Sequence, residues 1–504
     1  MRESIRSIFN RFESDKIIIS LSLLYIIIPI CIFFIGWLKI PFALFLCTLF
    51  IFFAYRIFQN ICSSSISLIN KSTGSYWIIT GSVCFFWVYL SGIGGFCYQN
   101  SDYWARNPIY RDLSTYSWPV VYNLSVESDV VQRITGSGNV GFVYYFTWWL
   151  PASGLSKLFH LGELIRSFLL FGWAFIGILL IIYCINRHVG KCTYVTTVIL
   201  IIFSGLDAVM YFLINGSFSL TEHIEWWAGY FQYSSNTTLL FFVFNQSIPV
   251  WLIVCILLQL KDNKYIAAVS SLVFPYSPWA VFGMIPIAVT GTFKHKNLLK
   301  KPSFLNVLNI MIPLALLLIY GSFYLSGSGS TGALGFQLLK VENVRKFFCN
   351  YIVFVFLEAG VYFCVMGSQE YQYYLTTLFE LLLIPLVSSR DGNFCMRASI
   401  PALFLLMTFV IRFFGTQPKD KITKRFLALI MICIIGAITT FTEINRSLTA
   451  TLTLNDDQLH REQVYSFGNI QTDEEKLIGE TKNQFFVYGF ENTFFFKYLA
   501  KTIS

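Results

Sequence analysis

Acidic and basic side chains gather in one polar stretch near the start of the chain. Residues 99–119 hold Asp102, Arg106, Arg111 and Asp112, and they follow a long apolar run. A carboxylate beside a membrane can act as a general base toward a hydroxyl group. Neighbouring arginines can bind a phosphate through paired hydrogen bonds. The stretch predicts either a catalytic, phosphate-binding loop or a solvated loop with local ion pairs.

A second polar group lies at 221–249 and combines acids with aromatic side chains. Glu222, His223 and Glu225 stand next to Trp226 in the sequence Thr-Glu-His-Ile-Glu-Trp-Trp. Aromatic faces flanked by carboxylates can bind a sugar, so these four residues are candidate substrate-binding residues. The Glu-His-x-Glu spacing could also bind a divalent cation, but it matches no zinc motif. The alternative is a belt of interfacial tryptophans with flanking charges.

A third polar group, at 388–401, contains Arg390 and Arg397. Arg397 is expected at the mouth of a helix, near enough to the lipid surface to meet a phosphate. A long basic side chain at a helix end can instead extend to the interface without any ligand. Both arginines are therefore candidate substrate-binding residues with a structural alternative.

Three further acids, Asp207, Glu358 and Glu380, fall within or near apolar runs. Ionisable side chains are costly inside a membrane and commonly have a function there. Asp207 is expected in the middle of a helix, where it either has such a function or forms a structural link to a backbone or arginine partner.

The elements that position these residues follow from composition. The chain has 504 residues, of which 56% are hydrophobic and 12% charged, whereas soluble domains carry about 25% charged residues. Apolar runs of about 20 residues, long enough to cross a membrane, recur along the chain. These runs are continuous, which favours helices and excludes a barrel of alternating strands. The sequence predicts an all-α fold, a polytopic transmembrane bundle with about 11–13 membrane segments.

Charge and cysteine content exclude several classes of protein. The net charge of +9 comes from basic residues in short loops, which the positive-inside rule explains without a nucleic-acid partner. The 12 cysteines are scattered without a Cys-x-x-Cys pair, so neither a disulfide framework nor a metal site is predicted. The first apolar run is expected to be a signal anchor rather than a cleaved signal peptide.

The basic residues also predict the layout of the chain. Residues 1–16 are expected in the cytoplasm, and 17–445 form the transmembrane domain with external loops 96–139 and 215–236. The tail 446–504 is expected outside, and is small for an independent core. The predicted helices are 17–37, 41–58, 75–95, 163–186, 192–214, 237–260, 303–325, 347–367, 371–388, 397–414 and 424–442.

Two apolar segments are expected to enter the membrane without crossing it. The aromatic segment 140–160 is broken by Pro151, and a full crossing would place the later basic residues Arg187 and Lys191 outside. The segment 265–292 has lysines on both sides and three internal prolines, which break helices. It is expected to form two short helices that dip in from the cytoplasmic side.

Together these features resemble the GT-C class of membrane glycosyltransferases. The resemblance rests on the acid that follows an early helix, on Asn-Pro-Ile-Tyr-Arg-Asp-Leu and Trp-Pro within 107–119, and on the proline-broken hairpin. It implies an external active site that uses polyprenyl-phosphate sugars, with Asp102 as the catalytic base and Asp112 as second choice. No Asp-x-Asp pair accompanies Asp102, so dependence on a divalent cation stays open. Residues 221–228 and 390–401 are also similar to segments of bacterial membrane proteins near polysaccharide loci.

The expected protein is a glycosyltransferase of the bacterial cytoplasmic membrane. It would move a sugar from a polyprenyl-phosphate carrier to a glycan, lipid or protein acceptor of the cell envelope. Arg106, Arg111 or Arg397 would stabilise the charge on the leaving phosphate. Two alternatives are a polysaccharide polymerase, which extends a lipid-linked repeat, and a flippase or transporter of lipid-linked glycans, which suits broken helices with buried acids.

Overall fold

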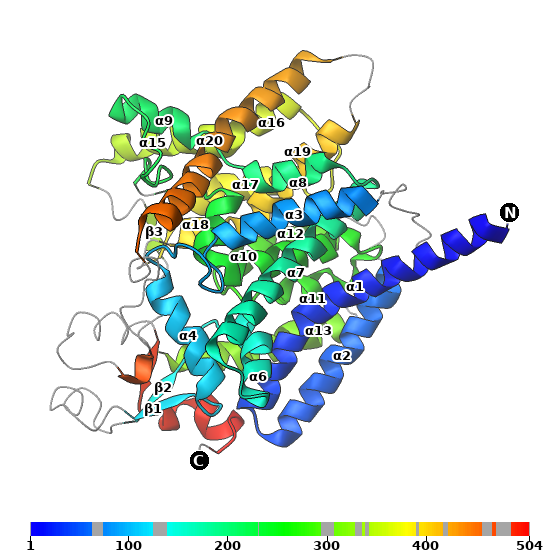
Figure 1. Cartoon of the computed structure of the whole chain (residues 1–504), viewed down its shortest axis with the longest axis vertical. Helices are drawn as coiled ribbons and strands as arrows, with labels where there is room; N and C mark the ends of the chain where they lie inside the picture. The colour runs from blue at the N-terminus through cyan, green and yellow to red at the C-terminus, as the bar shows by residue number, and fades with distance from the viewer. Residues whose placement is uncertain are drawn as a thin grey trace.

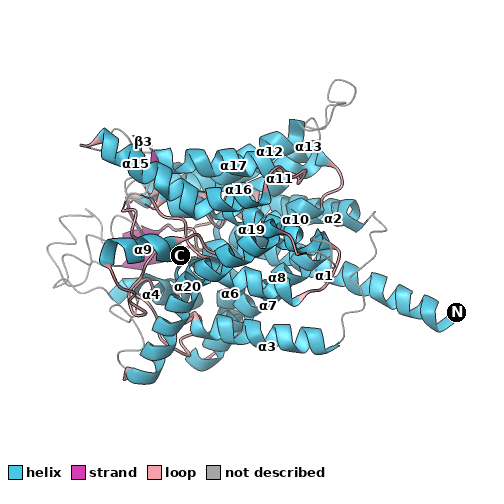
Figure 2. Cartoon of the chain, turned by 90° about the horizontal axis from the view of Figure 1, so that it is seen from above, coloured by secondary structure: helices cyan, strands magenta, loops and turns pink. Residues whose placement is uncertain are grey.

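The protein is built almost entirely of helices, with a few short strands at one end (Figures 1 and 2). The computed structural model describes residues 2–62, 74–123, 139–229, 231–293, 307–327, 335–337, 342–389, 393–416, 422–455, 466–469 and 485–502. Within these ranges the predicted all-α class is confirmed.

Among the described residues, eight helical spans are long and apolar enough to cross a membrane. This number fits a multi-pass membrane protein. They comprise α1 (Arg2–Trp37, apolar from Asp15), α2 (Ile40–Cys62), α7 (Glu163–Val189), α8 (Tyr194–Ile202) with α9 (Asp207–Asn215), α10 (Asn236–Gln259), α13 (Val307–Leu316) with α14 (Ser322–Ser326), α15 (Val344–Val355) with α16 (Val361–Met366), and α20 (Lys424–Thr453).

Shorter apolar helices complete the bundle. They are α3 (Gly74–Leu90), α12 (Ala280–Phe293), α17 (Tyr374–Leu383) and α19 (Ile400–Thr416). Four other helices lie in the connections: α4 (Tyr103–Thr115), α6 (Leu150–Leu158), α11 (Ile266–Ser271) and α18 (Phe394–Ala398).

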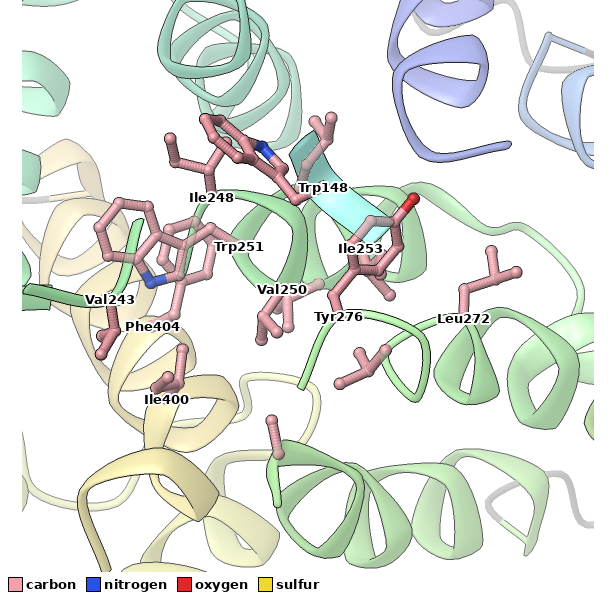
Figure 3. Packing of buried hydrophobic residues seen from close by; sticks show 14 of the residues in the cluster. Trp148, Val243, Ile248, Val250, Trp251, Ile253, Leu272, Tyr276, Ile400 and Phe404 are labelled. Carbon is pink, nitrogen blue, oxygen red and sulfur yellow. The ribbon is translucent and has the colours of Figure 1, made fainter. Parts of the chain in front are cut away.

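Helix α10 is the centre of the bundle and packs against α7, α19, α11, α1 and α20. In its most apolar stretch 94% of the residues are buried. Trp251 stacks on Phe404 of α19 with ring centroids 5.9 Å apart, and Ile248 and Trp148 fill the neighbouring space (Figure 3). A helix that is buried on nearly all sides lies in the core of such a bundle.

One end of the bundle carries the basic loops, and we call it the basic face. Asn60 at the end of α2 donates to Asp262 (3.2 Å), and Arg187 at the end of α7 donates to Gln259 at the end of α10 (2.6 Å). Lys191 reaches the carbonyl oxygen of Gly415 at the end of α19 (3.2 Å). These bonds gather the helix ends that the positive-inside rule predicts on the cytoplasmic side.

The opposite end, here the strand face, holds the connecting helix α4 and a small antiparallel sheet (Figure 1). Strands β1 (Val121–Asn123), β2 (Asn139–Phe142) and β5 (Phe486–Tyr488) pair in the order β1-β2-β5. A second pair joins β3 (Gly335–Phe336) to β4 (Val387–Ser388). The strands connect segments that are far apart in the sequence, so the strand face is a joint structure of several loops.

The C-terminal segment belongs to the strand face and not to a separate domain. The backbone N–H of Lys39 donates to Leu499, and that of Lys501 donates to Trp37, each at 2.9 Å. These bonds fasten residues 499–501 to the turn between α1 and α2. The start of α1 and the described end of the C-terminal segment therefore lie at opposite ends of the bundle (Figure 1).

Several predicted boundaries were wrong. Helix α20 continues to Thr453, so the tail begins after the expected residue 446. Asp207 is not in mid-helix, because the predicted helix 192–214 breaks at 203–206 and Asp207 begins α9. The break accommodates Glu358, since a Cβ at Gly205 would lie only 1.8 Å from its Oε2.

The two segments expected to be re-entrant are short in the structure. Residues 140–160 form β2, a 3₁₀ turn (Thr147–Trp149) and α6, none of which is long enough to span. Residues 265–292 form α11 and α12, which pack against each other. The side chain of Asn263 donates to the carbonyl oxygen of Gly291, so both ends of this pair meet on the basic face.

We predict from this contact that both ends of the α11–α12 pair lie on the cytoplasmic side. Lys261→Cys and Lys296→Cys, in a background with the exposed Cys349 and Cys364 changed to Ser, should both resist an impermeant thiol reagent added outside intact cells. Lys497→Cys, on the strand face, serves as the labelled control. Labelling of only one of the first two positions would show a full crossing.

Candidate functional site

The first polar group forms the turn that leads into α4. Asp102 precedes the helix, and its carboxylate lies 2.7 Å from the guanidinium of Arg106, one turn later. The Asp102 side chain is 40% exposed, while that of Arg106 is only 6% exposed. Asn100 accepts from the Asp102 backbone N–H (3.0 Å) and donates to the carbonyl oxygen of Phe241 in α10 (2.8 Å). The core helix thus fixes the turn that presents Asp102.

Arg106 makes its second contact with α10 itself. Its Nη1 donates to Asn245 Oδ1 at 3.2 Å, and its guanidinium carbon lies 5.6 Å from the ring centre of Phe244. Val243 has non-helical backbone angles (φ −133°, ψ 38°), which kink α10 just before these residues. The kink presents Asn245, which is fully buried, to Arg106.

Arg397 of α18 approaches the same place from the opposite half of the sequence. Its guanidinium carbon lies 5.8 Å from the ring centre of Tyr145. Tyr145 stacks on Tyr144 with centroids 3.8 Å apart, and Tyr144 lies within the electrostatic reach of both Arg106 and Arg397. We call Asp102, Arg106, Arg397, Tyr144 and Tyr145 the arginine site.

The electrostatics of this site favour an anion. Arg106 and Arg397 are close enough for each charge to act on the other. Burial is the largest influence on Arg106 and opposes its charged form, but Asp102, Tyr144 and Tyr145 together outweigh it and raise the pKa of Arg106. Burial also raises the pKa of Tyr144 well above its ordinary value, so its phenol stays neutral and can donate a hydrogen bond. Two guanidinium groups and a phenol donor suit the oxygens of a phosphate.

Arg111 and Asp112, on the same helix, have other partners. Arg111 lies 3.0 Å from Glu163 at the start of α7. Asp112 is fully buried and accepts hydrogen bonds from the Tyr122 hydroxyl (2.8 Å) and the Phe467 backbone N–H (3.0 Å). Asp112 therefore ties α4 to the sheet and the C-terminal tail, and its burial places it away from a substrate.

The second polar group lies on the strand face and is dispersed. Glu222 is exposed and accepts from Tyr211 (2.6 Å), and Trp226 is exposed beside the His223 ring, with centroids 4.8 Å apart. Glu225 is buried and accepts from the Ser235 backbone N–H (2.9 Å). Since Ser235 caps α10, the Glu225 carboxylate also sits at the positive end of that helix.

His223 joins this group to α20. Its Nδ1 lies 2.7 Å from Glu443, whose two oxygens both accept from Arg446 at 2.8 Å. Burial lowers the pKa of His223, but the bond to Glu443 and the charge of Glu225 outweigh it and raise the pKa above its ordinary value. The arrangement is a chain of alternating charges.

The two polar groups meet on neighbouring residues of α10. Asn100 bonds to Phe241, while the His223 ring lies 5.5 Å from that of Phe242. The structure thus brings Asp102, Arg106 and Arg397 into one site and places His223 and Glu225 nearby on the same face. Arg390 lies outside the described residues.

The proposed divalent cation finds no support in the described ranges. There, no group of three or more His, Cys, Asp or Glu side chains could hold a metal ion. In particular, Glu222 turns toward Tyr211 while His223 turns toward Glu443.

Sequence reasoning missed the neutral members of the arginine site and the partners of His223. Tyr144 and Tyr145 are two of many aromatic residues in their segment and carry no distinguishing pattern. Asn245, in Phe-Asn-Gln-Ser-Ile-Pro, is a polar residue within an apolar run, and such a residue marks a buried hydrogen bond. Glu443 is an acid within a spanning helix, and such a residue likewise indicates a buried polar contact.

Comparison with known proteins found no relative of this chain. No protein-family model matches the sequence, and no curated protein or solved structure is detectably similar.

We predict that Asp112 makes folding stability depend on pH. Burial raises the pKa of Asp112 to about 6, above the ordinary value of about 3.9. The folded protein therefore binds this proton more tightly, and stability falls as the pH rises from about 4 to about 6. Wild type should lose on the order of 2–3 kcal/mol over this window relative to Asp112→Asn, measured as unfolding in detergent.

Tyr122→Phe provides the matched variant for this test. It removes a hydrogen bond that lowers the pKa of Asp112, so the upper end of the window of falling stability should move to higher pH while its lower end stays. Parallel pH profiles for wild type and Asp112→Asn would show that Asp112 does not contribute.

Proposed function

We propose that the protein is a membrane glycosyltransferase of the GT-C type, which takes a sugar from a polyprenyl-phosphate carrier. The observation that supports this proposal is the arginine site. There, Arg397 lies over the Tyr145 ring, and Arg106, from a distant part of the chain, acts electrostatically on Tyr144 and pairs with the partly exposed Asp102 carboxylate. The strand face would be external, the membrane the bacterial cytoplasmic membrane, and the α11–α12 pair re-entrant.

Four residues of the site have a role in this reaction. The acceptor hydroxyl oxygen attacks the anomeric carbon of the donor, and Asp102 takes its proton. The bond between the anomeric carbon and the phosphate oxygen breaks, and the electron pair leaves with the carrier phosphate. Arg106 and Arg397 stabilise that charge, and Tyr144 can donate a hydrogen bond to it.

The ion pair between Asp102 and Arg106 supports a sequence in which the donor binds before Asp102 accepts the proton. While Arg106 holds the carboxylate at 2.7 Å, that carboxylate oxygen is engaged in a hydrogen bond. A donor phosphate that binds Arg106 competes for the same N–H group and releases the carboxylate. Donor binding would thereby prepare Asp102 to accept the proton.

We predict that Asp102→Asn lowers transfer by about 10²–10⁴-fold, because asparagine cannot take the proton. Arg106→Gln and Arg397→Gln should each lower it by about 10²–10³-fold, through loss of a donor to the leaving phosphate. The assay is purified protein with a panel of radiolabelled polyprenyl-phosphate sugars. Unfolding temperatures of the variants separate loss of chemistry from loss of fold.

Two further variants make this test decisive. Arg345→Gln removes an exposed cation at the start of α15 and should leave transfer within a few-fold of wild type. Arg111→Gln tests the other candidate arginine, which borders a separate cavity of about 460 Å³ with Gln99, Asn107 and Glu163. If Arg111→Gln abolishes transfer while Arg397→Gln does not, the phosphate site lies in that cavity instead.

A second function, transport of a lipid-linked glycan, is favoured by the break between α8 and α9. Asp207 at the break accepts from Trp227 (3.1 Å) and Ser204 (3.2 Å), and the Glu358 carboxyl lies against it. Both acids are buried within spanning helices. Broken helices with buried acids are typical of transporters that couple to protons or ions.

We predict that variants measured in proteoliposomes distinguish the transport function from the transferase function. If the protein is a transporter, Asp207→Asn and Glu358→Gln should each abolish movement of a labelled lipid-linked glycan between leaflets, measured by its access to an impermeant oxidant. Asp102→Asn should then leave that movement unchanged. If the protein is a glycosyltransferase, Asp102→Asn should lower sugar transfer in the transfer assay, whereas Asp207→Asn and Glu358→Gln should leave it unchanged.

A further inference from the structure

A second basic site lies on the strand face, away from the arginine site. A cavity of about 690 Å³ opens between the turn joining α1 to α2, the segment before β1, and the C-terminal segment. Lys39, Lys497 and Lys501 line it, with Glu491 as the acidic residue among its described lining. We call it the lysine groove.

The lysine groove lies at the level of the membrane surface. Helices α1 and α2 are both long enough to cross a membrane, so the turn that contains Lys39 must emerge at its surface. Beyond the turn, Ile40 and Leu44 of α2 are 72% and 63% exposed, as expected for a lipid-facing surface. Phe494 and Tyr498 of the C-terminal segment are also more than half exposed, and such aromatics are common at the interface.

The backbone holds the lysines together. Lys39 and Lys501 are neighbours through the hydrogen bonds that join the α1–α2 turn to residues 499–501. Lys39 Nζ also donates to the Tyr498 carbonyl oxygen at 2.9 Å. Like charges that share one groove repel each other, and an anion bound there would neutralise them.

A further lysine adds to the excess of positive charge. Lys157 of α6 donates to the Tyr116 carbonyl oxygen, and Tyr116 also lines the groove. Burial lowers the pKa of Lys157, and the nearby charge of Lys501 lowers it further. Lys157 and Lys501 therefore lie within electrostatic range of each other, with only Glu491 as acid along the described lining.

We propose that the lysine groove binds the phosphate group of an anionic membrane lipid, with the acyl or prenyl chains lying along the exposed face of α2. Polar groups of Asn123, Asn139 and Thr502 in the lining can bond to the rest of a headgroup. Basic side chains near a membrane surface attract anionic lipids, each by about 1 kcal/mol. The site is independent of the proposed sugar transfer, since none of its residues belongs to the arginine site.

The test is binding of defined lipids to the purified, delipidated full-length chain, measured by native mass spectrometry. We expect phosphatidylglycerol to bind about 10-fold more tightly than phosphatidylcholine. Lys497→Gln/Lys501→Gln should weaken phosphatidylglycerol binding by roughly 30-fold, as expected for the loss of two such attractions. The double variant keeps Lys39 and its hydrogen bond. Lys497→Arg/Lys501→Arg, which keeps both charges, should restore binding.

Matched controls separate the groove from general charge. Lys346→Gln/Lys424→Gln removes two exposed lysines elsewhere and should leave binding within about 2-fold of wild type. Unchanged phosphatidylglycerol binding in Lys497→Gln/Lys501→Gln, at wild-type unfolding temperature, would overturn the proposal.

Two further ligands, a polyprenyl phosphate and inorganic phosphate, test which kind of molecule carries the bound phosphate group. Preference for a polyprenyl phosphate over phosphatidylglycerol, lost in the same double variant, would support the site and assign the carrier lipid to it. Displacement of bound lipid by inorganic phosphate at equal concentration would show a site for a soluble anion and would overturn the lipid assignment. None of these outcomes depends on detecting sugar transfer.

Discussion

The structure depends on the complete burial of α10. A helix in the centre of a membrane bundle has no water to satisfy its polar groups, so every buried polar side chain needs a protein partner. The first half of α10 carries several such groups, and they bind other segments: Thr237 accepts from Trp87 (3.0 Å) and Asn245 from Arg106 (3.2 Å). Asn236 donates to Leu200 in α8 (2.9 Å). The helix is therefore the frame on which the loops of the strand face are assembled.

This constraint explains why residues from distant segments meet at the arginine site. Asn100 and Arg106 bind α10 on one side, while α18 leads into α19, which packs along the same helix. The kink at Val243 turns Asn245 toward α4. The Glu225 carboxylate accepts a hydrogen bond from the Ser235 backbone N–H at the N-terminal cap of the same helix. Glu225 therefore has a structural role in addition to its position near the arginine site.

The two faces of the bundle differ in how they carry charge. On the basic face, cations belong to short loops, and amide and carbonyl groups hold the helix ends together. The strand face holds two cationic sites with different surroundings. The guanidinium groups of the arginine site are packed among aromatic rings, whereas the ammonium groups of the lysine groove are near the lipid-facing surface of α2. Guanidinium is the more weakly hydrated cation, so it is the better suited to a buried position.

The sequence by itself determined the all-α class, the multi-pass character of the chain and the pairing of α11 with α12. These features follow from apolar length, loop charge and proline, which act locally. It also singled out Asp102, Arg106 and Arg397, because charged residues near membrane segments are rare.

Only the tertiary structure decided which of them meet. Arg111 and Asp112 share α4 with Arg106, yet the helix turns them toward α7 and the sheet. The break before Asp207 was likewise hidden, because it depends on Glu358, which lies far along the chain and fills the space beside Gly205. Contacts of this kind depend on how several helices pack together, and a local sequence pattern does not predict that packing.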